Sequence, residues 1–592
     1  MTKHLILLLS IILLTTGAVH AREGQVVVNS ADWVDVYSSI MYANLEGMPY
    51  YFVVDEPHAR ALPLYMNKEI EVYLVESDTV PYLPNYKSTL TDSGYNVVNH
   101  TLSSGGRKLN LELARELNIN RFIVLDDEYG YNAISVAPYA ARSKSWVLFV
   151  NRNNIDEVYA FLSERNVESI LIYGHVDRAV NERLSEFNPE KIDNGNRFDD
   201  NIAIIKKYLE IVQSKDLILT NGDFIEATIM SGESPVMFIG VDTVPPNVIE
   251  FLKGTQIQLG MVIGNDLIGS AKALKDSTGI NVIIKFGQGR KNTGGTTLVE
   301  ELDKFYLPKY ELTLDIAQVQ YNEGSKQLEM IYQNDAKLGE FFKTSVAIFA
   351  DGKRITTIGD ETVQYIYAGS ESGIAYNVDL TDYARTGNIS AQVSTEFGEA
   401  PGSLNLLLKK ELPVSVISVQ DNSEIKVSDL IYDTGTQRIS LLLENTGKVQ
   451  VYASPDVKLL INGKEETLRL GNAILLAAGE KKEPSLRVEL TQADLADNPQ
   501  AKVHVTYGER PRLLIKSLDG VYPLRLSGDK NVPIIVAIAS VIVLLGIVIR
   551  QRSKTRLKTT PCANCSEAVP DGAKFCPKCG KEVEEQNAQE QK

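Results

Sequence analysis

The chain has 592 residues, which is more than one hydrophobic core accommodates, so several domains are expected. A formal net charge of −16 argues against a nucleic-acid-binding protein, because phosphate groups are bound by Lys and Arg. Hydrophobic residues make up 44% of the chain and charged residues 23%, proportions that are typical of folded domains.

Residues 1–21 have the pattern of a cleaved secretory signal peptide. Lys3 supplies a basic start, residues 5–14 are apolar, and Ala21 ends a Val-His-Ala site that suits signal peptidase. An uncleaved N-terminal anchor is the alternative. Both interpretations place the region that follows outside the cytoplasm.

Residues 22–290 are interpreted as three copies of one α/β unit, at about 30–100, 101–190 and 191–290. Apolar runs such as 122–125 and 217–219 predict buried strands, and helical stretches follow them. The second and third copies are offset by 90 to 94 residues, and residues 32–43 match the opening helix of a more divergent first copy. Strands that alternate with helices predict parallel sheets covered on both faces.

Three short motifs of the third copy resemble the cell wall binding repeat 2 family. They are an arginine–aromatic pair at Arg197 and Phe198 that leads a helix, a Gly-Asp-Phe strand-end motif that begins at Gly222, and a strand that ends at Gly264. The family usually has three tandem copies, and the resemblance covers about 260 residues. It implies that this region attaches non-covalently to wall polymers, although the region is acidic and the chain has its own membrane anchor.

An enzyme active at the strand ends is the competing hypothesis, because parallel α/β sheets bind ligands at the carboxyl ends of their strands. Acidic clusters there can hold Ca²⁺ or Mg²⁺, but Asp and Asn also serve as helix N-caps. No Ser or Cys nucleophile accompanies His175, the histidine among these strand-end residues, so we predict no enzyme and no catalytic residue. The strand-end residues are Asp126, Asp127, Glu128, His175, Asp177, Asn221, Asp223 and Glu226.

The glycine-rich stretch 287–297 lacks the spacing of a phosphate-binding loop. We therefore predict a linker over residues 291–307.

Residues 308–415 and 416–527 are predicted to be two tandem β-sandwich domains. Asn334 recurs as Asn445 at an offset of 111, and an Asp-Gly turn at 351–352 recurs as Asn-Gly at 462–463. Alternating strands over about 110 residues suggest an immunoglobulin-like sandwich. The Asn-Thr-Gly turn at 445–447 resembles that of adhesion-type, S-layer-related domains. Asn99 and Asn388 head N-glycosylation sequons in the translocated region.

Residues 532–549 are predicted to form one transmembrane helix. The segment contains no charged residue and, at about 1.5 Å per residue, spans roughly 27 Å. Five cations follow within residues 550–558, in a basic juxtamembrane segment of 550–561 that should stay in the cytoplasm. A buried core helix is the alternative.

The cytoplasmic tail carries a strong metal-binding motif. Two Cys-x-x-Cys pairs are separated by ten residues, a spacing that closes a tetrahedral site for one structural Zn²⁺. Residues 562–580 resemble the small zinc-ribbon family, and 581–592 are expected to be disordered. A disulfide pair is the alternative, which a reducing compartment disfavours. The predicted ligands are Cys562, Cys565, Cys576 and Cys579.

These elements predict a multidomain, single-pass cell-membrane protein with an extracytoplasmic N-terminal region. Its head is expected to bind a surface glycan, an envelope polymer or a neighbouring surface protein. A receptor that signals to a cytoplasmic partner through the ribbon is the alternative.

Overall fold

The computed structural model describes residues 24–291, 297–385, 388–527, 559–570 and 572–582. It divides into two compact units, residues 1–420 and 421–592. The predicted signal peptide and the predicted membrane segment 532–549 lie outside the described residues. Within the described ranges, no helix is both long enough and apolar enough to cross a membrane.

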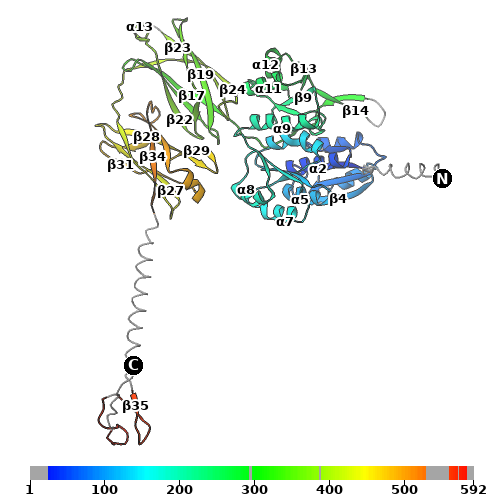
Figure 1. Cartoon of the computed structure of the whole chain (residues 1–592). Coiled ribbons are helices and arrows are strands. Elements are labelled where there is room, and N and C mark those ends of the chain that lie inside the picture. Colours follow the sequence, from blue (N-terminus) through cyan, green and yellow to red (C-terminus); the bar gives the residue numbers. More distant parts are fainter. Residues whose placement is uncertain (1–23, 292–296, 386–387, 528–558, 571, 583–592) are drawn as a thin grey trace, which may run out of the picture. The chain divides into compact units, whose positions relative to one another are not determined.

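The first unit begins with three four-stranded parallel sheets that share one strand order. In each sheet the first strand along the chain lies between the second and the third, and the fourth lies beyond the third. The predicted parallel-sheet units are thus confirmed (Figure 1). In spatial order, the strands of the first sheet are β2 (Tyr50–Phe52), β1 (Gln25–Asn29), β3 (Val72–Ser77) and β4 (Val97–Ser103). Those of the second sheet are β6 (Trp146–Phe149), β5 (Arg121–Leu125), β7 (Ser169–Tyr173) and β8 (Glu190–Ile192). Those of the third sheet are β11 (Val236–Phe238), β9 (Asp216–Thr220), β12 (Leu259–Val262) and β13 (Asn281–Ile284).

Helices that follow the first strand of each sheet correspond to one another. They are α2 (Trp33–Glu46), α6 (Tyr131–Ser143) and the short α10 (Ala227–Met230). Helices α5 (Gly106–Glu116) and α9 (Arg197–Ile211) instead precede the first strands of the second and third sheets. Residues 32–43 lie in α2 and at its N-cap, but α2 follows strand β1. The prediction that they form the opening helix of the first copy is therefore wrong, because they correspond to α6. The remaining helices are α3 (Glu56–Ala61), α4 (Tyr86–Asp92), α7 (Ile155–Ser163), α8 (Arg178–Leu184), α11 (Pro246–Lys253) and α12 (Ile268–Thr278).

A buried asparagine on each opening helix ties neighbouring sheets together. The side-chain amide of Asn110 on α5 donates to Ser38 Oγ on α2 at 3.0 Å and to a β6 carbonyl at 2.8 Å. Asn201 on α9 likewise donates to Ser135 Oγ on α6 at 2.7 Å and to a β11 carbonyl at 2.9 Å. Because buried amides must find partners, these bonds fix the packing of successive units.

Residues 297–307 of the predicted linker (291–307) are a folded part of the α/β region. Strands β14 (Gly287–Lys291) and β15 (Thr297–Glu301) form an antiparallel hairpin, and β16 (Phe305–Tyr306) pairs with β10 (Phe224–Ile225). Leu302, Phe305 and Leu307 are buried in the α/β core. Glycine content suggested a linker, whereas burial of these apolar side chains holds the segment against the sheets. We call residues 302–310 the strap.

Two sheets with a shared core follow the strap. The first contains β22 (Glu371–Asn377), β18 (Gln327–Asn334), β17 (Leu314–Asn322) and β25 (Ser415–Ile417). The second contains β20 (Lys353–Gly359), β19 (Glu340–Ala350), β23 (Ile389–Gly398) and β24 (Leu404–Pro413), with β21 (Gln364–Ile366) added to β19. Buried residues of both sheets form one apolar cluster, which makes this region a β-sandwich.

The second unit repeats this order of strands. Its long last strand, β34 (Lys516–Ser527), pairs antiparallel with β33 (Gln500–Gly508) and then parallel with β26 (Ile425–Asp433). The remaining strands are β27 (Arg438–Asn445), β28 (Val451–Ile461), β29 (Lys464–Arg469), β30 (Ile474–Leu476), β31 (Lys481–Lys482) and β32 (Ser485–Arg487). Short helices α13 (Thr381–Ala384) and α14 (Gln492–Asp497) occupy matching places in the two repeats.

The predicted hairpin turns are confirmed. Asp351 and Gly352, with φ of 50° and 76°, join β19 to β20; Asn462 and Gly463, with φ of 53° and 75°, join β28 to β29. Positive φ at both central residues defines the turn type that matches the twist of paired strands.

Candidate metal centre and strand-end sites

The four cysteines lie on two similar turns in the C-terminal segment. In the first turn, the amide of Cys562 donates to the carbonyl of Glu567, and the amide of Ser566 donates back to the carbonyl of Cys562, both at 2.8 Å. The same pair of bonds recurs around Cys576 at 2.9 Å. Strands β35 (Thr559–Pro561) and β36 (Ala568–Pro570) pair beside the first turn.

The sulfur positions match a tetrahedral metal site. Sγ of Cys562 lies 3.7 Å from Sγ of Cys579, and Sγ of Cys565 lies 3.5 Å from Sγ of Cys576. All four sulfurs are within 4.8 Å of one another. Four thiolates at about 2.3 Å from a zinc ion would be separated by about 3.8 Å. The segment is therefore suited to binding one zinc ion.

The environment of the sulfurs differs from one cysteine to the next. A backbone hydrogen bond from Lys581 lowers the pKa of Cys579 to about 6. At Cys565 a backbone hydrogen bond from Glu567 favours the thiolate, but desolvation and the neighbouring thiols outweigh it and raise the pKa to about 12. Four adjacent thiols resist ionising together, and a bound dication removes that resistance.

Acidic strand-end residues of the second sheet are held by basic partners. Asp127 accepts a hydrogen bond from Arg107 Nε at 2.7 Å. Asp177 accepts from Arg152 Nη2 at 2.7 Å, and this bond lowers the pKa of Asp177. Burial raises the pKa of Asp126, whereas Glu128 and His175 are exposed. The ion pairs occupy carboxylates that a cation would otherwise need.

The third sheet shows the same use of its strand-end acids. Glu226 caps α10 and pairs with Lys285 at 2.6 Å. Asp223 pairs with Lys309 of the strap at 3.1 Å and accepts from the side-chain amide of Asn221 at 3.0 Å. In the described part of the chain, three or more metal-ligating side chains gather only at the four cysteines. Glu226 and Asp223 therefore already have partners within the chain.

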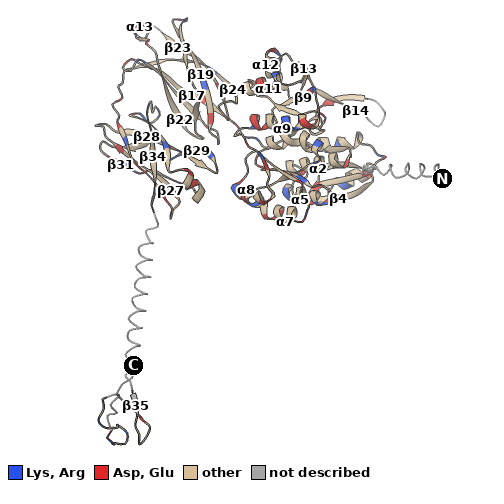
Figure 2. Cartoon of the chain, in the orientation of Figure 1, with Lys and Arg blue, Asp and Glu red and all other residues tan. Residues whose placement is uncertain are grey.

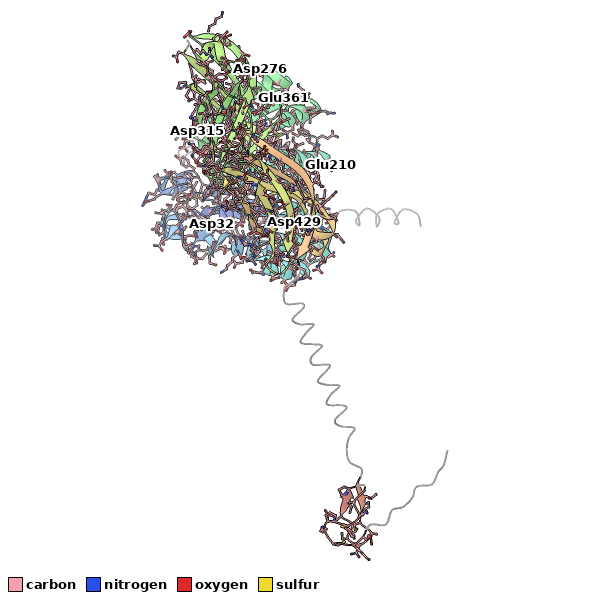
Figure 3. All side chains as sticks on the ribbon, turned by 90° about the vertical axis from the view of Figure 1, so that its left-hand side faces the viewer. Asp32, Glu210, Asp276, Asp315, Glu361 and Asp429 are labelled. Carbon is pink, nitrogen blue, oxygen red and sulfur yellow. The ribbon has the colours of Figure 1, made fainter. Side chains whose placement is uncertain are left out.

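Acidic and basic residues are interspersed along the elements of both units (Figure 2). Of the acidic residues labelled in Figure 3, Glu210, Asp276, Asp315 and Asp429 lie in α9, α12, β17 and β26, whereas Asp32 and Glu361 lie in loops. The net negative charge is thus spread along the chain.

Arg197, of the arginine–aromatic pair that leads helix α9, joins the α/β region to the first sandwich. Its guanidinium lies 4.2 Å from the centre of the Tyr131 ring, and its Nε lies 3.5 Å from Oε2 of Glu399. Its backbone amide donates to Oε1 of Glu399 at 3.1 Å. Both side chains are 12% exposed. Sequence reasoning singled out the arginine but missed Glu399, on the loop between β23 and β24, whose Gly-Glu-x-Pro sequence recurs at 508–511.

The two sequon asparagines are accessible. Asn99 is exposed on β4, the last strand of the first sheet, and Asn388 is exposed just before β23. Their glycosylation stays a prediction.

Comparison with known proteins identifies the C-terminal domain. The sequence model of the zinc-ribbon domain matches residues 562–583. This segment is a zinc ribbon. The match includes Lys581 and Glu582, which were assigned to the tail, and Glu582 forms a β-bridge with Phe575.

Solved structures that match parts of the chain include two surface proteins of low sequence identity. No curated protein matches its sequence. Cwp6 from Clostridium difficile is 14% identical with a TM-score of 0.36, over 43% of this chain and 44% of that protein, so the chain spans less than half of that relative. A bacterial ice-binding adhesin is 15% identical with a TM-score of 0.14, over 40% of this chain and 73% of that chain. Scores this low do not establish a shared fold.

Proposed function

We propose that the chain is a single-pass membrane protein of the cell surface. Its α/β region binds a surface glycan, an envelope polymer or a neighbouring surface protein, and the two sandwiches serve as a stalk. The order of segments carries this proposal: 531 residues without a cysteine precede an uncharged 18-residue apolar run, five cations and then the ribbon.

A binding role is favoured over an enzymatic one by the strand-end geometry. Asp127, Asp177, Asp223 and Glu226 each pair with an Arg or Lys of the same chain. A catalytic carboxylate must instead face a reacting group, and its pKa must suit the operating pH. The ribbon, closed by four sulfur ligands, presents a rigid surface to a cytoplasmic protein.

Protease added to intact cells tests the topology. We expect digestion of residues 24–527 and protection of the ribbon, detected by a tag at Lys592; protection of the sandwiches would overturn the proposal. A glycan and envelope-polymer array probed with residues 24–420 tests the binding role. Asp126→Asn, which changes a strand-end acid that forms no ion pair among the described residues, serves as the first site variant, and Asp519→Asn in the second sandwich as its control.

A further inference from the structure

The first and last strands of each sandwich are parallel neighbours. In the second sandwich, four residues of β26 pair with the last four residues of β34: Leu430 with Leu524, Ile431 with Arg525, Tyr432 with Leu526, and Asp433 with Ser527. In the first sandwich, β17 and β25 pair in the same way: Gln320 with Ser415, Tyr321 with Val416, and Asn322 with Ile417. The arrangement is thus a repeated property of the stalk.

This pairing decides how tension acts on the fold. A pull applied through the chain acts on the N-terminal end of β26 and on the C-terminal end of β34. Since the two strands run in the same direction, these ends lie at opposite ends of the pair, and the strands must slide past each other. All hydrogen bonds of the ladder are then loaded together. If both strands were pulled from the same end of the pair, the hydrogen bonds would instead break one at a time.

Further bonds reinforce the pair. Arg525 Nη1 lies 3.1 Å from Oδ2 of Asp429, and Ser527 Oγ donates to Oδ2 of Asp433 at 3.0 Å. The amide of Thr434 donates to the carbonyl of Ser527 at 3.3 Å. In the first sandwich, the amide of Glu323 donates in the same way to the carbonyl of Ile417 at 2.8 Å.

We propose that the two sandwiches resist tension along the chain and that their parallel terminal strands act as mechanical clamps. The inference rests on the proposed function in one respect, because tension arises only when the head is bound outside and the chain is anchored. The second clamp ends at Ser527, and the predicted membrane segment begins at Val532.

Force spectroscopy of the full zinc-loaded chain, held at its two ends, tests the clamp. Each sandwich releases about 100 residues on unfolding, an extension on the order of 300 Å, so a second recording with the N-terminal handle moved to Gln420 identifies the event of the second sandwich. Forced unfolding is governed by the unfolding rate. We expect Arg525→Pro, which breaks the clamp, to reduce the unfolding force by about half. The matched control Glu466→Pro, in the outer strand β29, should change it little. Equal reductions would overturn the proposal.

A change in pulling direction tests the same clamp in the native sequence. A peptide-tag handle inserted at the turn residue Gln437 pulls near the C-terminal end of β26, beside the end of β34. The strands should then peel apart at a clearly lower force than under end-to-end pulling. Equal forces in the two directions would contradict the clamp. Loss of array binding would contradict the proposed head function and leave this result unchanged.

Discussion

Glu340 is a fully buried carboxylate at the start of β19, where the second sandwich has Val451. Its Oε1 accepts a hydrogen bond from the amide of Thr313 at 2.5 Å, and its Oε2 has no hydrogen-bond partner among the described residues. Burial raises the pKa of Glu340 from its usual 4.5 to about 7. The tandem repeat shows that the fold itself does not require a carboxylate here.

We predict that the first unit loses stability as the pH rises from 4.5 through 7. The folded state favours the protonated carboxyl, so its stabilisation is complete below the unfolded-state pKa and is lost as pH passes the folded-state pKa. The loss is on the order of 3 kcal/mol. Glu340→Gln, which keeps an acceptor for Thr313 without titrating, should remove this contribution and leave that of Asp35, whose pKa is raised by burial to about 6. Denaturant unfolding at pH 5 and pH 8 measures the effect, and the transition of the second unit, with Val451, is the internal control.

The buried pair of Arg197 and Glu399 provides a second residue-scale prediction. Arg197→Ala should lower the unfolding free energy of the first unit by about 3 kcal/mol, because Glu399 remains buried without its cation. Arg197→Met combined with Glu399→Leu should recover most of that loss. Arg152→Ala, at a side chain that is 72% exposed, should cost less than about 1 kcal/mol. An Arg197→Ala protein as stable as the wild type would show that the contact between Arg197 and Glu399 does not stabilise the first unit.

The residue scale also shows what a single sequence can reveal. The zinc cysteines were predicted because the Cys-x-x-Cys spacing fixes the local turn on which both sulfurs lie. Glu399 was missed because it lies 202 residues from Arg197, and no local pattern encodes a contact over that separation. The strand-end acids were correctly placed after their strands, but their Arg and Lys partners depend on packing between elements.

At the scale of elements, periodicity predicted the parallel-sheet units, because apolar strands alternate with helices. The strap was missed because its apolar residues are few and glycines precede them. Its fit is close: a Cβ added at Gly130 would lie 2.5 Å from Leu307 Cβ, and the amide of Gly130 donates to the carbonyl of Pro308 at 3.0 Å. Element boundaries set by such tertiary contacts cannot be read from local sequence.

We predict that Gly130→Ala displaces the strap and destabilises the first unit by about 1 to 3 kcal/mol, as overpacking does. Leu307→Ala should restore part of the stability in the double variant, because it removes atoms from the overlap. Gly269→Ala is the control, since a Cβ there meets no atom within 4 Å. Limited proteolysis near residues 297–310 reports on strap release. A Gly130→Ala protein with unchanged stability and unchanged cleavage would show that the strap is not closely packed.

At the scale of the whole molecule, metal dependence should be confined to the ribbon. Every cysteine lies at or after residue 562, and elsewhere in the described ranges no three metal-ligating side chains gather within 4.8 Å. The ribbon has only a small buried cluster, around Val569 and two of the cysteines, so zinc must supply much of its folding free energy. The α/β region and the sandwiches have extensive apolar cores of their own.

We therefore predict one zinc ion per chain, held by Cys562, Cys565, Cys576 and Cys579 as thiolates. Cys576→Ser should weaken zinc binding strongly, because a hydroxyl is a poor substitute for a soft thiolate. Removal of zinc with a chelator should unfold the ribbon and leave the unfolding transitions of residues 24–527 at their original temperatures. Metal analysis, followed by calorimetry with and without chelator, measures both effects, and Ser566→Ala, beside a ligand but bearing no sulfur, is the matched control. A stoichiometry below one zinc ion per chain in reduced protein would refute the site. A chelator-induced shift of an unfolding transition in the α/β region or the sandwiches would reveal a second metal dependence, and would refute the prediction that metal dependence is confined to the ribbon.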